Sequence, residues 1–553
     1  MFVKNRGAFM KTVKTKAFSI ITAFLMVFTL VSLIPEGTLT ASAATTYDLE
    51  LFGVKVTSAN AADILGDGAA SYNAGSKTLT IKKDIKGTDY IIKNKIKGLT
   101  IKTTKALTLE STDHPGLYLI TDATIQTNGK LTIKTAEGCG AISCSLVGDY
   151  RSVITIKDSD IEANASSGLY GFFNDSTLNI INSNIKMNAT NNDMGSLSGF
   201  NKGVFLTNCF VKTPADAVLE CGGLYAANSA TTEPVKTVEI CRGRLAGQNR
   251  YSTAAAISKA SFEKTSNVLL ASGASYADAL AGVVLAKKLQ APILLTAKDT
   301  LSAETLAEIN RLGAKNITIL GGESAVSKAV EKTLTDKGLK VQRIQGNTRY
   351  GTAADIADKV SSDPTVLFFV CGLDYADALS VSPVASIMGA PIIYLTKDGN
   401  IEAETARYLA ALKKKGCVKT AYVIGGENAV SKAMMQKAGN ALGLTVDKQM
   451  IRISGANRYS TCTKVNSTFA DIVKKDMICI ATGLDFPDAL AGGVLASLHA
   501  APLFLVNGKA SPSLSKEQKE YLSAKHPNSM AIFGGTGVVP DRTVGEINAA
   551  SKK

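Results

Sequence analysis

Three arginine–tyrosine pairs recur in the C-terminal half of the chain, each behind a glycine. They are Arg250–Tyr251, Arg349–Tyr350 and Arg458–Tyr459, within GQNRYSTAAAIS, GNTRYGTAADIA and GANRYSTCTKVN. A guanidinium group presents several N–H donors in one plane and can hold phosphate or carboxylate groups bidentately. The adjacent tyrosine could stack on a sugar ring, although packing is the more common role of such a residue. The repeated pair therefore indicates either an anion-binding site or a structural contact.

An aspartate follows each arginine at a nearly constant distance along the chain. Asp278, Asp377 and Asp488 come 28, 28 and 30 residues after the three arginines. Each aspartate stands between a strand-like run and an alanine-rich helical run, where it fits an N-cap or a first-turn position. The paired spacing favours an ion pair inside each copy. The same residues could also contact a ligand at an interface between copies.

A pair of glycines closes a later strand in every copy. The pairs are Gly321–Gly322, Gly425–Gly426 and Gly534–Gly535. A strand, two glycines and a helix make a sharp turn whose amides point outward at the helix start, where an anion can bind. Turn geometry alone also explains the glycines. None of the three turns has the Lys-Ser/Thr ending of a nucleotide-binding loop.

These residues require a scaffold that is repeated with them. From about residue 240, apolar strand-like runs alternate with helix-like runs, which is the pattern of a parallel sheet covered by helices. Hydroxyl residues such as Ser252, Thr352 and Ser460 stand where helix N-caps are expected. The spacing predicts three tandem α/β modules over 240–343, 344–450 and 451–553. We expect a pseudo-threefold arrangement, with an open string as the alternative.

The preceding half of the chain has a different rhythm. Over residues 44–235, short runs of alternating apolar and polar residues recur at spacings of 23, 24 and 26 residues and end at Asn, Asp or Gly. A period of this length predicts a parallel β-solenoid with one rung per repeat, and a β-sandwich is the second interpretation. The whole fold is therefore expected to be mixed, with a β-solenoid followed by α/β modules. Pro234 marks the expected hinge.

Composition places the chain outside the cell. A basic leader, an apolar run and small residues near Ala43 predict that residues 1–43 are a cleaved signal peptide. Residues 44–246 hold 20 basic and 20 acidic side chains, whereas residues 247–553 hold 36 and 26, a surplus of +10. The excess positive charge lies in the repeated half and suits a polyanionic partner. Nine cysteines without a CxxC motif do not indicate a disulfide scaffold.

The repeats resemble the cell-wall-binding repeat family found on clostridial surface proteins. The resemblance rests on the segments NRYSTA, YADALAG, APILLT and ILGGESAVS and covers about residues 240–553 in three copies. It implies non-covalent attachment to an anionic cell-wall polysaccharide or a teichoic-acid-like polymer. The opening of the β half resembles extracellular β-helix domains often described as carbohydrate-binding. The third copy departs from the pattern, with Phe486–Pro487 in place of Tyr-Ala.

We therefore expect a secreted, wall-anchored surface protein that displays a β-solenoid, with a glycan as the candidate ligand of that half. No cofactor, no metal and no nucleic-acid partner is expected, and the membrane is met only through the signal peptide. The alternative is a wall-tethered polysaccharide lyase or hydrolase, for which Asp158, Asp160 and Glu162 are candidate carboxylates. These three residues also fit a solvated strand face. An adhesin for host glycans is a third, weaker hypothesis.

Overall fold

The computed structural model describes residues 43–144, 152–190, 195–215, 217–220, 223–225, 235–473 and 476–552. The expected signal peptide lies outside these ranges except for its last residue, and so does the expected hinge at Pro234. Within the described ranges, no helix combines the length and apolar character needed to cross a bilayer.

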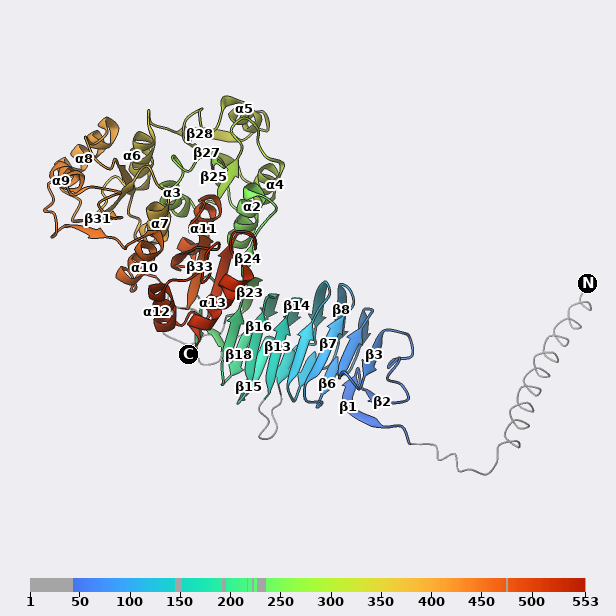
Figure 1. The fold of residues 1–553 in the computed structure, drawn as a ribbon. Coiled ribbons are helices and arrows are strands. Elements are labelled where there is room, and N and C mark those ends of the chain that lie inside the picture. Colours follow the sequence, from blue (N-terminus) through green and yellow to red (C-terminus); the bar gives the residue numbers. More distant parts are fainter. Residues whose placement is uncertain are drawn as a thin grey trace, which may run out of the picture. The chain divides into compact units, whose positions relative to one another are not determined.

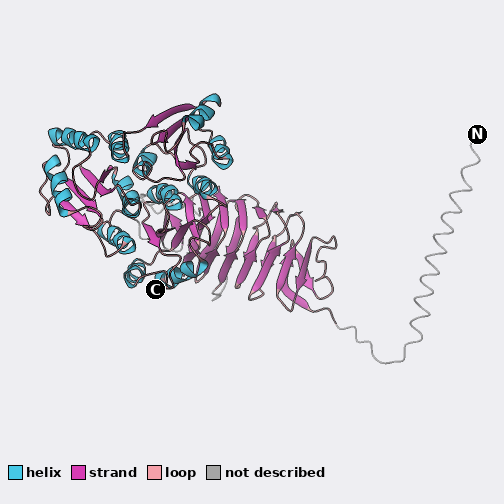
Figure 2. Ribbon diagram, turned by 45° about the horizontal axis from the view of Figure 1, so that its top comes forward, coloured by secondary structure: helices cyan, strands magenta, loops and turns pink. Residues whose placement is uncertain are grey.

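Residues up to Arg242 form a β-solenoid of three seven-stranded sheets (Figures 1 and 2). The first sheet contains β2 (Val54–Thr57), β1 (Thr46–Leu51), β6 (Ile92–Asn94), β9 (Leu117–Leu119), β12 (Gly140–Cys144), β15 (Ser167–Asn174) and β18 (Leu197–Phe200). The second contains β3 (Ala70–Asn73), β4 (Thr78–Ile81), β7 (Leu99–Thr103), β10 (Ala123–Gln126), β13 (Val153–Lys157), β16 (Thr177–Ile181) and β19 (Val204–Thr207). The third contains β5 (Ile85–Gly87), β8 (Leu107–Ser111), β11 (Lys130–Lys134), β14 (Asp160–Ala165), β17 (Asn184–Ala189), β23 (Thr237–Arg242) and β20 (Cys209–Thr213).

The rungs stack because alternate side chains of each strand face a shared interior. Leu99, Ala123, Ile154 and Leu178 are aligned by parallel pairing of successive rungs, and all four are buried. Their partners on the outer faces are polar, which gives the period of two that defines a half-buried strand. The β-solenoid interpretation is therefore confirmed, and the sandwich alternative is wrong.

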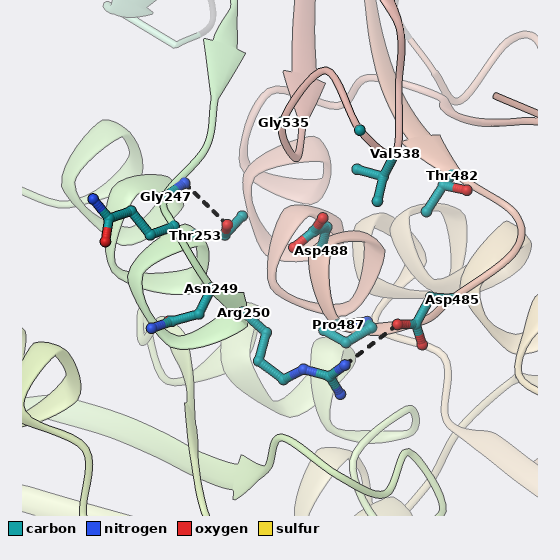
Figure 3. A pocket seen from close by; sticks show the side chains of 12 residues that line it. Gly247, Asn249, Arg250, Thr253, Thr482, Asp485, Pro487, Asp488, Gly535 and Val538 are labelled. Atoms are coloured by element: carbon teal, nitrogen blue, oxygen red, sulfur yellow. Dashed lines mark hydrogen bonds and ion pairs between the residues drawn. The ribbon is translucent and has the colours of Figure 1, made fainter. Parts of the chain in front are cut away.

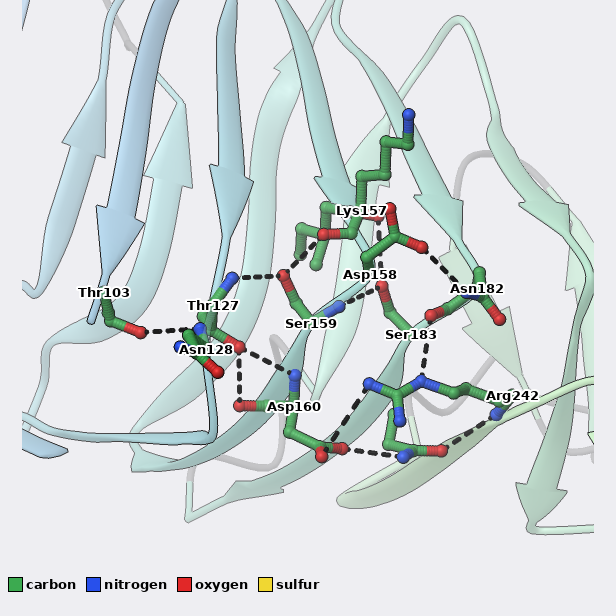
Figure 4. A network of polar contacts seen from close by, with 12 residues as sticks. Thr103, Thr127, Asn128, Lys157, Asp158, Ser159, Asp160, Asn182, Ser183 and Arg242 are labelled. Atoms are coloured by element: carbon green, nitrogen blue, oxygen red, sulfur yellow. Dashed lines mark hydrogen bonds and ion pairs between the residues drawn. The ribbon is translucent and has the colours of Figure 1, made fainter. Parts of the chain in front are cut away.

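Polar residues at the turns fix the rungs against one another (Figure 4). The amide of Thr127 donates to the hydroxyl of Ser159 at 3.1 Å, and the amide of Ser159 donates to that of Ser183 at 3.1 Å. Ser159 and Ser183 are fully buried. Each hydroxyl satisfies a backbone donor that the turn leaves without a partner, so the ladder stabilises the turns from one rung to the next.

The solenoid extends past residue 235, the limit expected from the sequence. Strand β23 inserts antiparallel between β17 and β20, pairing Ile185 with Ile240 and Phe210 with Cys241. A short hairpin, β21 (Val218–Glu220) and β22 (Gly223–Tyr225), lies between β20 and β23 in the sequence. The last solenoid strand therefore ends at Arg242, and Gly243 separates it from the α/β half.

The α/β half consists of three similar modules. The first contains α2 (Arg250–Ser261), β25 (Asn267–Ser272), α3 (Gly282–Lys288), β26 (Ile293–Thr296), α4 (Ala303–Leu312), β27 (Asn316–Leu320), α5 (Lys328–Asp336) and β28 (Lys340–Ile344). The second contains α6 (Arg349–Val360), β29 (Val366–Cys371), α7 (Ala376–Met388), β30 (Ile392–Leu395), α8 (Ala403–Lys415), β31 (Thr420–Ile424), α9 (Lys432–Leu442) and β32 (Met450–Ile453). The third contains α10 (Arg458–Thr468), β33 (Met477–Thr482), α11 (Pro487–Leu498), β34 (Leu503–Val506), α12 (Lys516–Lys525), β35 (Ser529–Phe533) and α13 (Asp541–Ser551).

Each module has a parallel four-stranded sheet, and the third sheet takes its last strand from before the first module. The strand orders are β26-β25-β27-β28, β30-β29-β31-β32 and β34-β33-β35-β24. Strand β24 (Arg244–Leu245) precedes α2 in the sequence but pairs with β35, with Arg244 opposite Ile532. The chain thus closes the ring of modules with its own first segment.

The modules share one hydrophobic core. Helices α3, α7 and α11 contact one another, and one continuous cluster of buried side chains draws on all three modules. A Cβ added at Gly493 of α11 would lie 3.0 Å from Ser382 of α7 and 3.3 Å from Val283 of α3. The three helices therefore meet around a common axis, and the expected pseudo-threefold arrangement is confirmed over the open string.

Candidate functional site

The repeated glycine–arginine segment is the loop that starts the first helix of each module. The N-caps are Asn249, Thr348 and Asn457, one residue before each arginine. Ser252 is the N3 residue of a capping box, so the expectation that it was itself the N-cap is wrong by three positions. Thr253 accepts a hydrogen bond from the amide of Gly247 at 3.0 Å, and the other two modules repeat this bond. The loop therefore holds each arginine at the first residue of a helix.

Each arginine donates to the strand-end glycine of its own module. Arg349 Nη1 lies 2.9 Å from the carbonyl oxygen of Gly372, Arg458 Nη1 lies 2.7 Å from that of Gly483, and Arg250 makes the same bond to Gly273. The tyrosines after the arginines pack on these glycines: a Cβ at Gly273 would lie 2.6 Å from the ring of Tyr251. Tyr350 and Tyr459 take the same position against Gly372 and Gly483.

The ionic partner of the arginine comes from the neighbouring module. Arg458 Nη2 lies 3.2 Å from Asp374 Oδ2, and Arg250 Nη2 lies 3.5 Å from Asp485 Oδ2. The expected ion pairs with Asp278, Asp377 and Asp488 inside each module are therefore wrong. The side chain leaves the helix toward the module interface, where a different aspartate, three residues earlier in the sequence, meets it.

An aromatic cluster lies on the axis where the modules meet. The ring centroids of Tyr276 and Tyr375 are 5.4 Å apart, and those of Tyr276 and Phe486 are 5.7 Å apart. Each guanidinium lies over one of these rings, with Arg458 5.2 Å from the centroid of Tyr375. Arg250 and Arg349 lie 5.9 Å from the rings of Phe486 and Tyr276. Such cation–π contacts strengthen the interface.

The first glycine of each glycine pair makes room for the predicted aspartate. Gly321, Gly425 and Gly534 have φ values of 99°, 106° and 101°, a region that favours glycine. A Cβ at Gly321 would lie 2.5 Å from Oδ2 of Asp278, and the other two glycines stand in the same way against Asp377 and Asp488. Aspartate and glycine pair are therefore one structural unit in each module.

Burial raises the pKa of Asp377 to about 6, and the neighbouring carboxylate of Asp374 raises it further, while Arg458 lowers it. Burial likewise raises the pKa of Asp488 to about 6, with Asp485 raising it and Arg250 lowering it. Both aspartates occupy the first turn of their helices, as the sequence indicated.

Two of the interfaces contain polar cavities. The cavity between the third and first modules has a volume of about 270 Å³ and is lined by Asn249, Arg250, Asp485, Asp488 and Gly535, among others (Figure 3). The cavity between the first and second modules has a volume of about 230 Å³. Its lining includes Ser275, Asp278, Gly322, Asn347 and Arg349. Each cavity joins the glycine–glycine turn of one module to the capping loop of the next.

The site brings together most of the residues expected from the sequence. The lining residues of the two cavities include Arg250, Arg349, Asp278, Asp488, Gly322 and Gly535. The three tyrosines after the arginines are not among them. Sequence reasoning missed Asp374 and Asp485, although both lie in the repeated LDYAD and LDFPD segments that contained the signal.

The candidate carboxylates of the solenoid are bound to neighbouring rungs (Figure 4). Asp158 Oδ1 accepts from Asn182 at 2.7 Å, and Asp160 Oδ1 accepts from Asn184 at 2.7 Å. Glu162 forms an ion pair with Lys130, whose hydrogen bond lowers the pKa of the glutamate below its usual value. Within the described ranges no group of three or more His, Cys, Asp or Glu residues is placed to hold a metal ion.

Tandem α/β modules with polar cavities between them define a repeat-built binding unit. The model of the family described as cell wall binding domain 2 matches residues 244–331, 343–435 and 452–544. The three C-terminal modules of this chain therefore belong to the cell wall binding domain 2 family.

Relatives of this chain are bacterial wall proteins. It is 31% identical over 309 residues to the N-acetylmuramoyl-L-alanine amidase LytC of Bacillus subtilis (strain 168), which covers 55% of this chain and 57% of the amidase. It is 30% identical to the amidase enhancer of the same organism, over 52% of this chain and 40% of the enhancer. The chain thus spans about half the length of the curated relatives it matches.

A solved structure has the same α/β architecture. Cwp6 from Clostridium difficile aligns with a TM-score of 0.50 and 26% identity, over 56% of this chain and 48% of Cwp6. Together with the family match, these similarities identify the chain as a secreted, cell-wall-associated surface protein whose repeats bind the cell wall.

Proposed function

We propose that the three repeats act together to hold an anionic cell-wall polysaccharide or a teichoic-acid-like polymer without a covalent bond. The observation that carries this proposal is the composition of the interface cavities. An arginine guanidinium, a capping loop with Asn249 or Asn347, and a glycine–glycine turn converge in each. Guanidinium groups suit phosphate and carboxylate, and the amide and hydroxyl side chains suit sugar hydroxyls.

Repetition supports binding to a polymer rather than to a small molecule. The interfaces are joined through one rigid core, so a polymer that contacts one cavity brings its next units close to another. Linked weak sites then bind much more tightly than any one of them alone. The surplus of +10 in residues 247–553 adds a general attraction for a polyanion.

We further propose that the chain is a binding and display protein rather than an enzyme, with the solenoid contacting a glycan. This is supported by the role of the solenoid carboxylates, because Asp158 and Asp160 are committed to hydrogen bonds between rungs. The lowered pKa of Glu162 also makes that residue a poor proton donor near neutral pH.

The second candidate function is hydrolysis or elimination on a wall glycan by the solenoid. The similarity to an amidase and to an amidase enhancer favours a place beside wall-degrading enzymes, although each covers only part of its relative. A reducing-sugar assay on a panel of acidic polysaccharides separates the two functions. Release of reducing ends by the wild-type chain, lost in Glu162→Gln, would establish the enzyme.

Wall binding is tested by co-sedimentation. Residues 44–242 and 243–553 are produced separately, because the last solenoid strand ends at Arg242. Each half is mixed with purified Gram-positive cell walls, with and without chemical removal of their anionic polymers. We expect only residues 243–553 to pellet, only with intact walls, and less at high salt, since ionic contacts are screened. Pelleting of the solenoid half alone would contradict the proposal.

A further inference from the structure

The three module interfaces differ at one residue of the turn that meets the arginine. The second and third modules place Asp374 and Asp485 there, whereas the first module has Ser275. The arginines opposite the two aspartates form ion pairs, at 3.2 Å for Arg458 and 3.5 Å for Arg250. Arg349, which faces the turn of Ser275, has no such partner.

The guanidinium of Arg349 is held in place but is not neutralised. Its Nη1 donates to the carbonyl oxygen of Gly372 at 2.9 Å, and the group lies 5.9 Å from the ring centroid of Tyr276. Among the residues that the structure describes, no carboxylate lies within ion-pair distance of it. Position and planarity match the other two arginines, while the positive charge stays available.

Ser275 preserves the local turn while it removes the charge. Its hydroxyl oxygen accepts a hydrogen bond from the amide of Ala277 at 3.4 Å. In the second module, Asp374 Oδ1 accepts the equivalent bond from Ala376 at 3.1 Å. Serine and aspartate both support this kind of turn, so the exchange leaves the backbone alike and alters only the electrostatics.

Charge balance separates the cavities accordingly. Between the third and first modules, Arg250 shares its cavity with two carboxylates, Asp485 and Asp488. Between the first and second modules, Arg349 shares its cavity with one carboxylate, Asp278. An anionic group entering the first of these cavities meets a surplus of negative charge, whereas in the second it meets a balanced pair and an uncommitted guanidinium.

We propose that the cavity between the first and second modules is the one that binds the phosphate or carboxylate group of the wall polymer, with Arg349 as the residue that determines this. The two interfaces whose arginines are already paired contact the uncharged, hydroxyl-bearing parts of the same polymer. This inference rests on the proposed function, which requires only that the repeats bind the wall, and it adds which site reads the charge.

The test exchanges residue 275 in the full mature chain. Ser275→Asp copies the second and third modules and supplies the missing carboxylate, while Ser275→Asn has the same size and no charge. Binding to purified Gram-positive cell walls is measured by co-sedimentation at several salt concentrations. Since a hydrogen bond to a charged group contributes 1.5–3 kcal/mol, we expect Ser275→Asp to bind about tenfold or more weakly than Ser275→Asn. Its affinity should also depend less on salt.

A second variant keeps the proposal testable if aspartate at position 275 perturbs folding. Asp485→Ser copies the first module at the interface of Arg250 and should strengthen wall binding, because it frees a second guanidinium. Equal binding by the Asp and Asn variants, or weaker binding by Asp485→Ser, would overturn the assignment to Arg349. Failure of the wild-type chain to pellet would instead overturn the proposed function itself.

Discussion

The guanidinium of Arg458 in the third module lies 3.2 Å from the carboxylate of Asp374 in the second module. The same guanidinium donates to the hydroxyl of Tyr375 at 3.1 Å and to the carbonyl of Gly483 in its own module at 2.7 Å. One side chain thus connects the end of a strand in one module to a turn and an aromatic ring in another. Repeated arginines at this position join modules to one another.

We expect Arg458 and Asp374 to be energetically coupled across the interface. The side chains are 31% and 46% exposed, so solvent screens the pair and the coupling should be about 0.5–1 kcal/mol. A double-mutant cycle with Arg458→Gln and Asp374→Asn, followed by urea unfolding, measures it. The matched cycle with Arg349→Gln and Ser275→Ala should give a value near zero. Equal coupling in both cycles would contradict the assignment.

The two glycines of a glycine pair should respond differently to alanine. Gly425 has a φ of 106°, and a Cβ there would collide with Asp377, whereas a Cβ at Gly426 meets nothing within 4 Å. We expect Gly425→Ala to lower the free energy of unfolding by about 2 kcal/mol or more, and Gly426→Ala to leave it within about 0.5 kcal/mol. Chemical denaturation of the two variants makes the comparison, which fails if both lose stability alike.

Stability should rise when the pH falls from about 6 toward 4. The pKa of Asp377 is raised to about 6 in the folded protein from an ordinary value of 3.8, so the folded state binds more protons in this window. The contribution is fully present below pH 3.8 and is lost as the pH rises through about 6. Asp377→Asn should therefore reduce the slope of the unfolding free energy against pH between 4 and 6, by up to about 1.4 kcal/mol per pH unit.

The Asp374→Asn variant tests the cause of that pKa shift. Asp374 raises the pKa of Asp377 by charge repulsion, so its removal should lower the pKa of Asp377 and narrow the pH window without removing the titrating group. Unfolding measured at half-unit pH steps gives both slopes. An unaltered profile in Asp374→Asn would show that burial alone sets the pKa.

Arg244 should matter to the third module as much as Arg343 matters to the first. Arg244 Nη1 donates to the carbonyls of Gly534 and Val539 at 3.0 and 2.9 Å, although these residues are about 290 positions away in the sequence. Arg343 makes the equivalent bond to Gly321 at 2.8 Å. We expect each alanine substitution to cost about 1–3 kcal/mol.

Hydrogen exchange locates the effect of these two substitutions. Arg244→Ala should increase exchange in β35 and in the loop that follows it, and Arg343→Ala should do so in β27. Unaltered exchange in residues 529–540 of Arg244→Ala would argue that β24 contributes nothing to the third module.

Much of the architecture follows from periodicity. A spacing of 24 residues between buried positions such as Ile154 and Leu178 requires stacked rungs, and the alternation of apolar strands with helical runs requires parallel sheets. The residues of the site could also be read from their repetition. Their partners could not, because a constant spacing between Arg458 and Asp488 is equally compatible with a contact inside a module and with a shared role at an interface.

The antiparallel insertion of β23 and the pairing of β24 with β35 were beyond the sequence pattern for a related reason. Both are short strands whose partners are distant or run in the opposite direction, and two residues such as Arg244 and Leu245 carry no period. Tertiary packing, rather than local preference, decides such strands.

Strand β24 has a consequence for how the protein is completed. It is made before any of the three modules, yet its partner β35 ends at Phe533, close to the last described residue. Until β35 exists, the edge that β24 belongs to cannot form, and a chain shortened before Ser529 leaves the ring open at the third module. The closing strand therefore makes the finished anchor a property of the full-length polypeptide: a truncated product would reach the wall with an incomplete grip.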